Sequence, residues 1–284
     1  VGEKQKNLPI EIWVNKPNRV KLSIISPSGE MIDNLDSKNA NNERIKFLYE
    51  GTEMIVNFTS PELSTGDSHI FIRAYNLKAG IWKFRLTGQY IVEGKYYAWI
   101  PQRELLDSET KFLNSVGYTT LTLSSTSNRA ISVAYYNQED NSVVTESGRG
   151  YTRDKMIKPD IAAGGFNAIV TNPGGGTAVI SGASVAGAVV AGCCVLILQW
   201  AVTDKNYPDI YAEQIKAYII SGAKGRPGDV YPNKEWGYGM LDMNGIFDRI
   251  KDTYNPRKSE DYEEYRVNNL FIRIPKSRYN RTIN

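Results

Sequence analysis

The sequence contains only two cysteines and one histidine in 284 residues. Cys193 and Cys194 are adjacent in one apolar run, where neighbouring side chains point in different directions and cannot readily bond to each other. We therefore predict two small buried hydrophobes, which excludes a disulfide framework and a four-ligand zinc site. His69 is the single histidine, so within this chain it is the only candidate for the histidine base of a hydrolase.

No strong charge of one sign is present either. The chain has 34 basic and 31 acidic residues, a net charge of +3, and no basic stripe. Such a balance argues against nucleic acid as a partner. The apolar content of 41% is enough for a substantial core, so we expect a globular protein.

Long apolar runs are also scarce. The one sustained run, Val185–Ala201, has about the minimum length of a membrane span, but its alanines, glycines and cysteines suit close packing. We predict a buried helix and no membrane span. The sequence starts at Val1 without an initiator methionine or a signal segment, which favours a fragment or a proteolytic product.

Residues 1–114 show short β-rich runs at even spacing. Apolar and polar residues alternate in many of them, and turn residues such as Pro27-Ser28-Gly29 separate them. This pattern predicts an all-β, jelly-roll-like antiparallel sandwich of about eight strands. The expected strands are Leu8–Val14, Arg19–Ser26, Ile45–Tyr49, Glu53–Phe58, His69–Tyr75, Ile81–Leu86 and Tyr90–Ile100.

Aromatic residues are frequent in this first domain. The candidates for a sugar-stacking face, which would make the sandwich a glycan-binding module, are Trp13, Trp82, Phe84, Tyr97 and Trp99. The favoured interpretation is that they fill the sandwich core or its join to the rest of the molecule, because aromatic side chains dominate core burial. His69 is interpreted as a strand-end residue rather than a catalytic base, since a base needs a supporting carboxylate and a position opposite its nucleophile.

The composition changes in residues 115–284, which we predict to form an α/β domain. Tyr118–Leu123 and Ala130–Tyr136 are expected strands, and the second has the continuous apolar character of a parallel sheet. Tyr211–Ser221 and Leu241–Ile250 are expected helices. The polar tail 254–284 is interpreted as solvated, although Leu270–Ile274 has the pattern of an edge strand.

Ser184 is the candidate nucleophile. It lies where a small, flexible segment enters the long apolar helix, so its position offers unpaired helix-terminal N–H groups to a developing negative charge. The alternative is that Ser184 is an ordinary N-cap.

Four segments decide between these alternatives. In chain order they are Ser147–Gly150, Lys158–Gly165, Gly182–Ala188 and Trp236–Asp242. Together they resemble the Ser-x-Arg-Gly turn, the Lys-Pro-Asp-Ile-x-Ala-Pro-Gly loop, the Gly-Thr-Ser-x-Ala-x-Pro helix start and the aromatic-Gly-x-Gly segment of subtilisin-like serine proteases. The resemblance implies the carboxy-terminal part of a subtilisin-like parallel sheet. It also implies that Ser184 is the nucleophile and that its own N–H is one oxyanion contact.

The sequence departs from the family pattern at several positions. Ala183 stands in place of threonine, Ala188 and Val189 in place of a Pro-His pair, and Gly164 in place of a proline. No segment resembling the family's Asp or His motifs precedes Ser184, nor does one for the asparagine of the oxyanion hole. The resemblance therefore implies that an amino-terminal segment outside this chain supplies all three.

A subtilisin-like protease interrupted by a jelly roll is similar to the Csp-type germination proteases of clostridial spores. That family implies a serine endopeptidase in the bacterial spore, with a propeptide, whose protein substrate is the zymogen of a cortex-lytic enzyme. It also includes inactive pseudoproteases that act as regulators, which is the alternative function. No cofactor is required; calcium is compatible with the family, but no calcium ligands can be read from these residues. Without its amino-terminal half the chain is expected to be neither active nor stable, because the apolar faces of Ala130–Tyr136 and of the helix 184–201 would be exposed.

Overall fold

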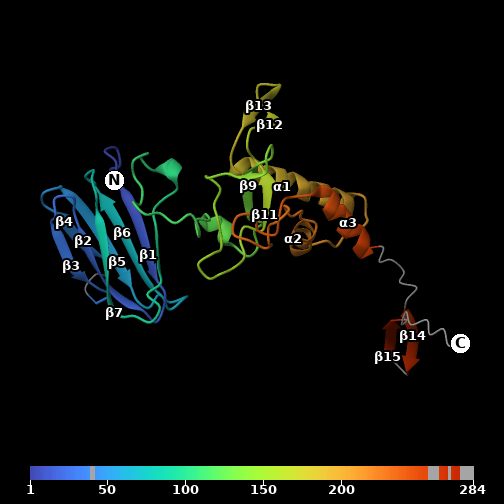
Figure 1. The fold of residues 1–284 in the computed structure, drawn as a ribbon, viewed down its shortest axis with the longest axis horizontal. Helices are drawn as coiled ribbons and strands as arrows, with labels where there is room; N and C mark the ends of the chain where they lie inside the picture. Colours follow the sequence, from blue (N-terminus) through green and yellow to red (C-terminus); the bar gives the residue numbers. More distant parts are fainter. Residues whose placement is uncertain (39–41, 255–261, 268–269, 276–284) are drawn as a thin grey trace. The chain divides into compact units, whose positions relative to one another are not determined.

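The computed structural model describes residues 1–38, 42–254, 262–267 and 270–275 (Figure 1). The chain divides into two units, Val1–Ser115 and Val116–Asn284. Each unit is described separately below.

Unit 1 consists of two antiparallel sheets. One has the strand order β4-β5-β6-β1-β8 and the other has the order β3-β2-β7. The strands are β1 (Leu8–Val14), β2 (Arg19–Ile25), β3 (Met31–Leu35), β4 (Glu43–Phe47), β5 (Thr52–Thr59), β6 (Ser68–Tyr75), β7 (Lys83–Tyr90) and β8 (Tyr96–Trp99). The prediction of several antiparallel strands is confirmed, but β3 was not expected and the last two strands have different bounds. The finer jelly-roll description stays a prediction.

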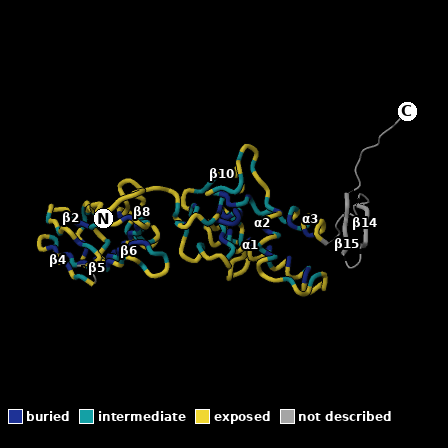
Figure 2. The backbone as a smooth tube through the Cα atoms, turned by 90° about the horizontal axis from the view of Figure 1, so that it is seen from below, coloured by how far each residue is buried: buried dark blue, intermediate teal, exposed yellow. Residues whose placement is uncertain are grey.

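Alternating burial builds the core of unit 1. Every second residue of β5 and β6 is buried, as the period of a strand with one face on a core requires. Both sheets supply members of one core cluster, including Phe47 and Met54 from the larger sheet and Leu22 from the smaller (Figure 2). A 3₁₀ turn, η1 (Arg103–Leu105), follows the last strand.

Unit 2 has a small mixed sheet of order β10-β9-β11, in which β9 and β11 are parallel. A separate hairpin, β12 with β13, leads into helix α1 (Figure 1). Its elements are η2 (Leu123–Thr126), β9 (Val133–Asn137), β10 (Ser142–Val143), β11 (Ile161–Gly164), β12 (Ala168–Thr171), β13 (Thr177–Ile180), α1 (Ala183–Leu198) with the π-helical turn η3 (Gln199–Thr203), α2 (Ala212–Ser221), α3 (Met243–Tyr254), β14 (Tyr262–Val267) and β15 (Leu270–Pro275).

Side chains cover both faces of the β9–β11 pair. On one face Tyr135, Ile161 and Ala163 pack with the three helices, and on the other Ala134 and Ala162 pack with Trp236. The expectation that Ala130–Tyr136 would expose an apolar face in this chain is therefore wrong. One parallel pair is present, and the wider order of a subtilisin-like sheet stays a prediction.

Two other expectations need correction. Tyr118–Leu123 is not a strand, because its backbone runs through bends into η2. Helix α1 is not fully buried: Val185, Val190, Cys193 and their neighbours on one face are covered, while residues on the opposite face stay exposed. Leu270–Ile274 does pair as a strand, as part of the antiparallel hairpin β14–β15. The remainder of the predicted tail, residues 255–261, 268–269 and 276–284, lies outside the described residues.

Candidate active site

Ser184 lies in the first turn of α1 and is exposed to solvent. The N-cap of this helix is Gly182, and it makes no side-chain capping hydrogen bond. The interpretation of Ser184 as an ordinary N-cap is therefore wrong. The hydroxyl group of Ser184 is accessible and does not cap the amino terminus of the helix.

The backbone N–H groups in the first turn of α1 differ in their hydrogen bonding. The N–H groups of Val185 and Ala186 both donate to Gly182 O, at 3.1 and 3.3 Å. For the N–H of Ser184 itself, no acceptor is found among the residues that the structure describes. Since this N–H also lies at the positive end of the helix dipole, it is suited to bind an oxyanion.

Gly165 holds the start of α1 against the end of β11. Gly182 N donates to Gly165 O at 2.8 Å. A Cβ on Gly165 would lie 2.8 Å from Gly182 O and 3.1 Å from the Cβ of Ala186, so a side chain here would push the helix away. Gly182 has a φ of 150°, which residues with a side chain rarely adopt. These two glycines fix the place of Ser184.

The segment Trp236–Asp242 runs along the other edge of β11. Tyr238 N donates to Asp160 O at 3.0 Å, Ala162 N to Gly239 O at 2.8 Å, and Leu241 N to Ala162 O at 2.8 Å. Gly237, with a φ of 59°, approaches the carbonyl of Pro159 so closely that a Cβ would overlap it. The sequence resemblance identified the segments Lys158–Gly165 and Trp236–Asp242, and the structure brings the two together.

The turn Ser147–Gly150 joins the same assembly. Ser147 Oγ accepts from Tyr135 N in β9 at 3.1 Å, and Gly150 N donates to Lys234 O at 2.8 Å. A Cβ on Gly150 would overlap the carbonyl of Lys158. All four motif segments are thus neighbours in unit 2, and β9 and β11 are the scaffold that they share.

An ion network that the sequence did not reveal lies at the start of β11. Lys158 Nζ is 2.6 Å from Asp160 Oδ2, and Lys216 Nζ of α2 is 2.9 Å from Asp160 Oδ1. Lys158 and Asp160 are only 2% and 3% exposed, and this desolvation lowers the pKa of Lys158. Lys158 also donates to Ala130 O at 2.9 Å. The network ties the Lys-Pro-Asp segment to a helix 56 residues later, which no local spacing could show.

His69 lies in unit 1, on strand β6. Its ring stacks on Trp13 with centroids 4.2 Å apart, and its Nε2 is 3.6 Å from Glu11 Oε2. The approach of His69 lowers the pKa of Glu11. His69 is therefore built into the sandwich surface, as the interpretation of a strand-end residue requires. In the described part of the chain, no cluster of three or more metal-ligating side chains is found.

Of the three candidate sugar-stacking tryptophans, Trp13 and Trp99 lie on the neighbouring strands β1 and β8, whereas Trp82 belongs to neither strand. Trp82 packs on the sandwich core, edge-on to Phe47 with centroids 5.0 Å apart. Trp13 stacks on His69, and Trp99 stacks on Tyr97 with centroids 5.4 Å apart. Core packing thus accounts for Trp82, whereas Trp13 and Trp99 are half-buried outside the core cluster, so the glycan-binding alternative stays a prediction.

The two cysteines, Cys193 and Cys194, lie side by side in the sequence of helix α1. Cys193 is buried, Cys194 is half-buried, and both are free thiols. Burial raises the pKa of Cys193 to about 11. The helical stretch Ala183–Thr203 is long and apolar enough to span a membrane by length and composition alone, and a third of its most apolar window is buried. A single such helix is weak evidence for a span, so its absence stays a prediction.

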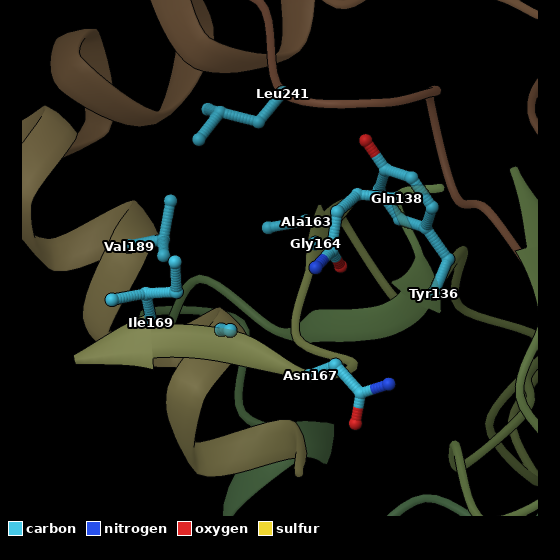
Figure 3. Close-up of a pocket in the computed structure, with 9 residues that line it drawn as sticks. Tyr136, Gln138, Ala163, Gly164, Asn167, Ile169, Val189 and Leu241 are labelled. Carbon is cyan, nitrogen blue, oxygen red and sulfur yellow. The ribbon is translucent and has the colours of Figure 1, made fainter. Parts of the chain in front are cut away.

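A cavity of about 510 Å³ lies at the carboxyl end of β11 (Figure 3). Val189 and Ile169 form one wall, Tyr136 and Gln138 lie opposite, and Leu241 closes the top of the view. Ser184 is not one of its lining residues. The cavity is a separate feature beside the candidate nucleophile.

Comparisons with known proteins agree with this geometry. Residues 111–239 match the model of the Subtilase family. The solved structure of the CspB protease of Clostridium perfringens is similar to the chain, with 28% identity, a TM-score of 0.80, and 90% of this chain and 54% of that chain covered. The chain thus spans about half the length of that protease. Among curated proteins, no match was found.

Two maturation proteases are similar over a shorter stretch. Patellamide maturation protease PatA has 24% identity and a TM-score of 0.40, with 48% of each chain covered. Prenylagaramide maturation protease PagA has 22% identity and a TM-score of 0.40, with 46% of each chain covered. These two likenesses are too weak to carry an argument about the site.

Proposed function

From the premise that residues 111–239 are the subtilase segment of a CspB-like serine protease, we propose that Ser184 is the nucleophile of a serine endopeptidase. The observation that carries this proposal is the combination at the start of α1. Ser184 is exposed and is not the N-cap, and its N–H has no acceptor among the described residues. A capping serine would have used its hydroxyl group, whereas this one is free to react.

The proposed mechanism is acyl transfer. Ser184 Oγ attacks the substrate carbonyl, and the N–H of Ser184 donates to the oxyanion that forms. A histidine, held by an aspartate, takes the hydroxyl proton and gives it to the leaving amine. Water then hydrolyses the acyl-enzyme. Neither the base nor the second oxyanion donor is found near Ser184 among the described residues, so both come from an amino-terminal part of the same protein.

The surface of unit 2 supports such a partner. The outward face of α1 is apolar and uncovered, and includes Val195 at 62% and Leu196 at 49% exposure. In the described part of the chain, no strand pairs with Val133 and Ala134 on the edge of β9 opposite β11. An open strand edge beside an exposed apolar helix is what a missing part of a parallel sheet would cover.

The biological role follows the similarity to the CspB protease. We propose that the sandwich is a jelly-roll-like domain inserted between the two parts of the catalytic domain, and that a propeptide accompanies the complete protein. The proposed substrate is the zymogen of a cortex-lytic enzyme in the bacterial spore. The alternative, an inactive regulator of the same fold, differs in the amino-terminal residues and not in Ser184.

Labelling of the full-length protein with a fluorophosphonate tests this proposal. Wild type should be labelled, and Ser184→Ala should lose all labelling, because the reactive hydroxyl is gone. Ser181→Ala is the matched control: Ser181 lies three residues earlier, and its Oγ accepts from Asn167 N at 2.8 Å. This variant should still be labelled. An unlabelled wild type would instead support the regulator.

A further inference from the structure

The cavity beside α1 lies where the backbone pairing of β11 stops. Ala162 uses both of its backbone groups with the neighbouring segment: its N–H donates to Gly239 O and its carbonyl accepts from Leu241 N, both at 2.8 Å. Two residues later in the strand, Gly164 directs its groups to the same side. Among the described residues, no partner is found for the N–H or the carbonyl of Gly164. One donor and one acceptor of a strand edge therefore face the cavity that Gly164 lines (Figure 3).

The cavity also offers an apolar wall. Ile169 is 75% exposed and Val189 is 46% exposed, and both line the cavity together with Leu241. In Figure 3 the side chains of Ile169 and Val189 lie next to each other, on the side away from Gln138. A volume of about 510 Å³ is within the range of sites that hold a ligand. An exposed strand edge next to an apolar wall is the combination that binds extended peptides.

We propose that this cavity is an exosite for an extended segment of the protein substrate, and this inference rests on the proposed protease function. The substrate main chain pairs with the N–H and the carbonyl of Gly164. A branched or aromatic apolar side chain of the substrate packs against Ile169 and Val189. The site is separate from the groups that react, so it selects substrates without taking part in the chemistry.

The segment that lines the cavity also holds the nucleophile in place. Gly165 O accepts from Gly182 N, two residues before the nucleophile. A peptide bound at Gly164 is therefore held next to the first turn of α1. Continuity of the two sites favours the substrate as occupant over an unrelated protein.

This exosite depends on the departure of Gly164 from the family pattern. A proline at this position has no N–H, whereas glycine provides one. A Cβ at position 164 would lie 3.1 Å from the Cβ of Gln138, which is tight but within the range that a small shift relieves. Gly164→Ala and Gly164→Pro introduce the same Cβ, and proline in addition removes the N–H and places its ring where that N–H would meet the substrate. Since this N–H makes no described hydrogen bond, proline breaks no pairing within the protein.

The test compares cleavage of peptides with reaction of a small probe in the full-length protein. Substrates are internally quenched decapeptides in a positional-scanning library, and the small probe is a fluorophosphonate. Wild type should prefer Leu, Ile, Phe or Met at one position of the library. Val189→Asp should remove that preference and lower kcat/KM for the preferred peptides about 10-fold. Val230→Asp, a control at a valine that is 82% exposed and does not line the cavity, should change neither.

The backbone contact has its own readout. Gly164→Pro should lower kcat/KM for all the peptides about 5-fold relative to Gly164→Ala, with the side-chain preference unchanged. The fluorophosphonate rate should stay at the wild-type value in every variant, because the probe is too small to reach the exosite.

Other results overturn the exosite. One is a wild type that reacts with fluorophosphonate but shows no apolar preference or cleaves no peptide. Another is a Val189→Asp variant whose probe reaction falls together with peptide cleavage, which would mean that the amino-terminal part of the protein covers the cavity. A wild type that does not react with the probe contradicts the proposed protease itself, so the two failures are distinguishable.

Discussion

The two units stabilise their structures in different ways. In unit 1, alternating apolar residues of two antiparallel sheets meet in one core, and residues such as Leu22, Met54 and Ile72 are fully buried. In unit 2, the small sheet is held by close glycine contacts and by the buried Lys158–Asp160–Lys216 network, and one face of α1 remains apolar and exposed. Unit 1 buries its apolar side chains within itself, whereas unit 2 leaves an apolar helix face exposed, which the proposed amino-terminal part would cover.

The largest effect is expected from the buried ions of unit 2. Asp160→Asn leaves two ammonium groups near Ala130 without their carboxylate, so unit 2 should lose about 3 to 5 kcal/mol of its free energy of unfolding. Hydrogen exchange resolved by unit should show the loss in unit 2 alone. Lys251→Met is the control, since the Lys251–Asp248 pair is exposed and its removal should cost less than about 1 kcal/mol. Equal effects of the two changes would contradict the structural role of the network.

A slightly smaller effect is expected from the core of unit 1. Ile72→Ala removes a fully buried side chain and should cost about 3 kcal/mol, with the loss confined to hydrogen exchange in unit 1. Leu63→Ala is the matched control, because Leu63 is 99% exposed and its truncation should change stability by less than about 0.5 kcal/mol. If Ile72→Ala also opened unit 2, the two units would not be independent.

A weaker effect concerns pH and Glu11 in unit 1. His69 lowers the pKa of Glu11 below its ordinary value of 4.5, so the folded state binds this proton less readily than the unfolded state. The stabilisation is therefore present above that value and is lost as the pH falls through the folded-state pKa. Glu11 is half-exposed, so the contribution should be under about 1 kcal/mol. When urea unfolding is measured from pH 6 to pH 3, the free energy of unfolding should fall more steeply with falling pH for wild type than for Glu11→Gln. The same pH dependence in both proteins would disprove the pairing.

The last effect is on the reactivity of a thiol in unit 2 and not on stability. The raised pKa of Cys193, about 11, leaves little thiolate at pH 8. Iodoacetamide should therefore modify native Cys193 about 100-fold more slowly than it modifies the unfolded chain. Mass spectrometry of the modified peptide measures this rate. Fast modification of Cys193 in the native protein would mean that α1 opens readily.

The sequence predicted those features that depend on local pattern. The alternation in β5 and β6 has the period of a half-buried strand, and the four motif segments identified the assembly around Ser184. The strand β3 (Met31–Leu35) was not predicted, because only one of its five residues is buried and its apolar and polar residues do not alternate.

Other features depend on contacts between distant residues. The pairing of Lys216 with Asp160 joins segments 56 residues apart, and exposure of one face of α1 depends on what covers the helix rather than on its composition. The unpaired N–H of Gly164 follows from where the neighbouring segment ends, although the departure from proline was visible in the sequence. Tertiary context decided each of these.

The most direct test of the central claim is to identify the labelled residue. The protein is treated with a fluorophosphonate, digested, and its peptides are mapped by mass spectrometry, once for the full-length protein and once for the chain of residues 1–284. The account predicts a label on Ser184 in the full-length protein and almost none in the chain alone, because the base comes from the amino-terminal part. A label on another residue, or equal labelling of Ser184 in both samples, would contradict it.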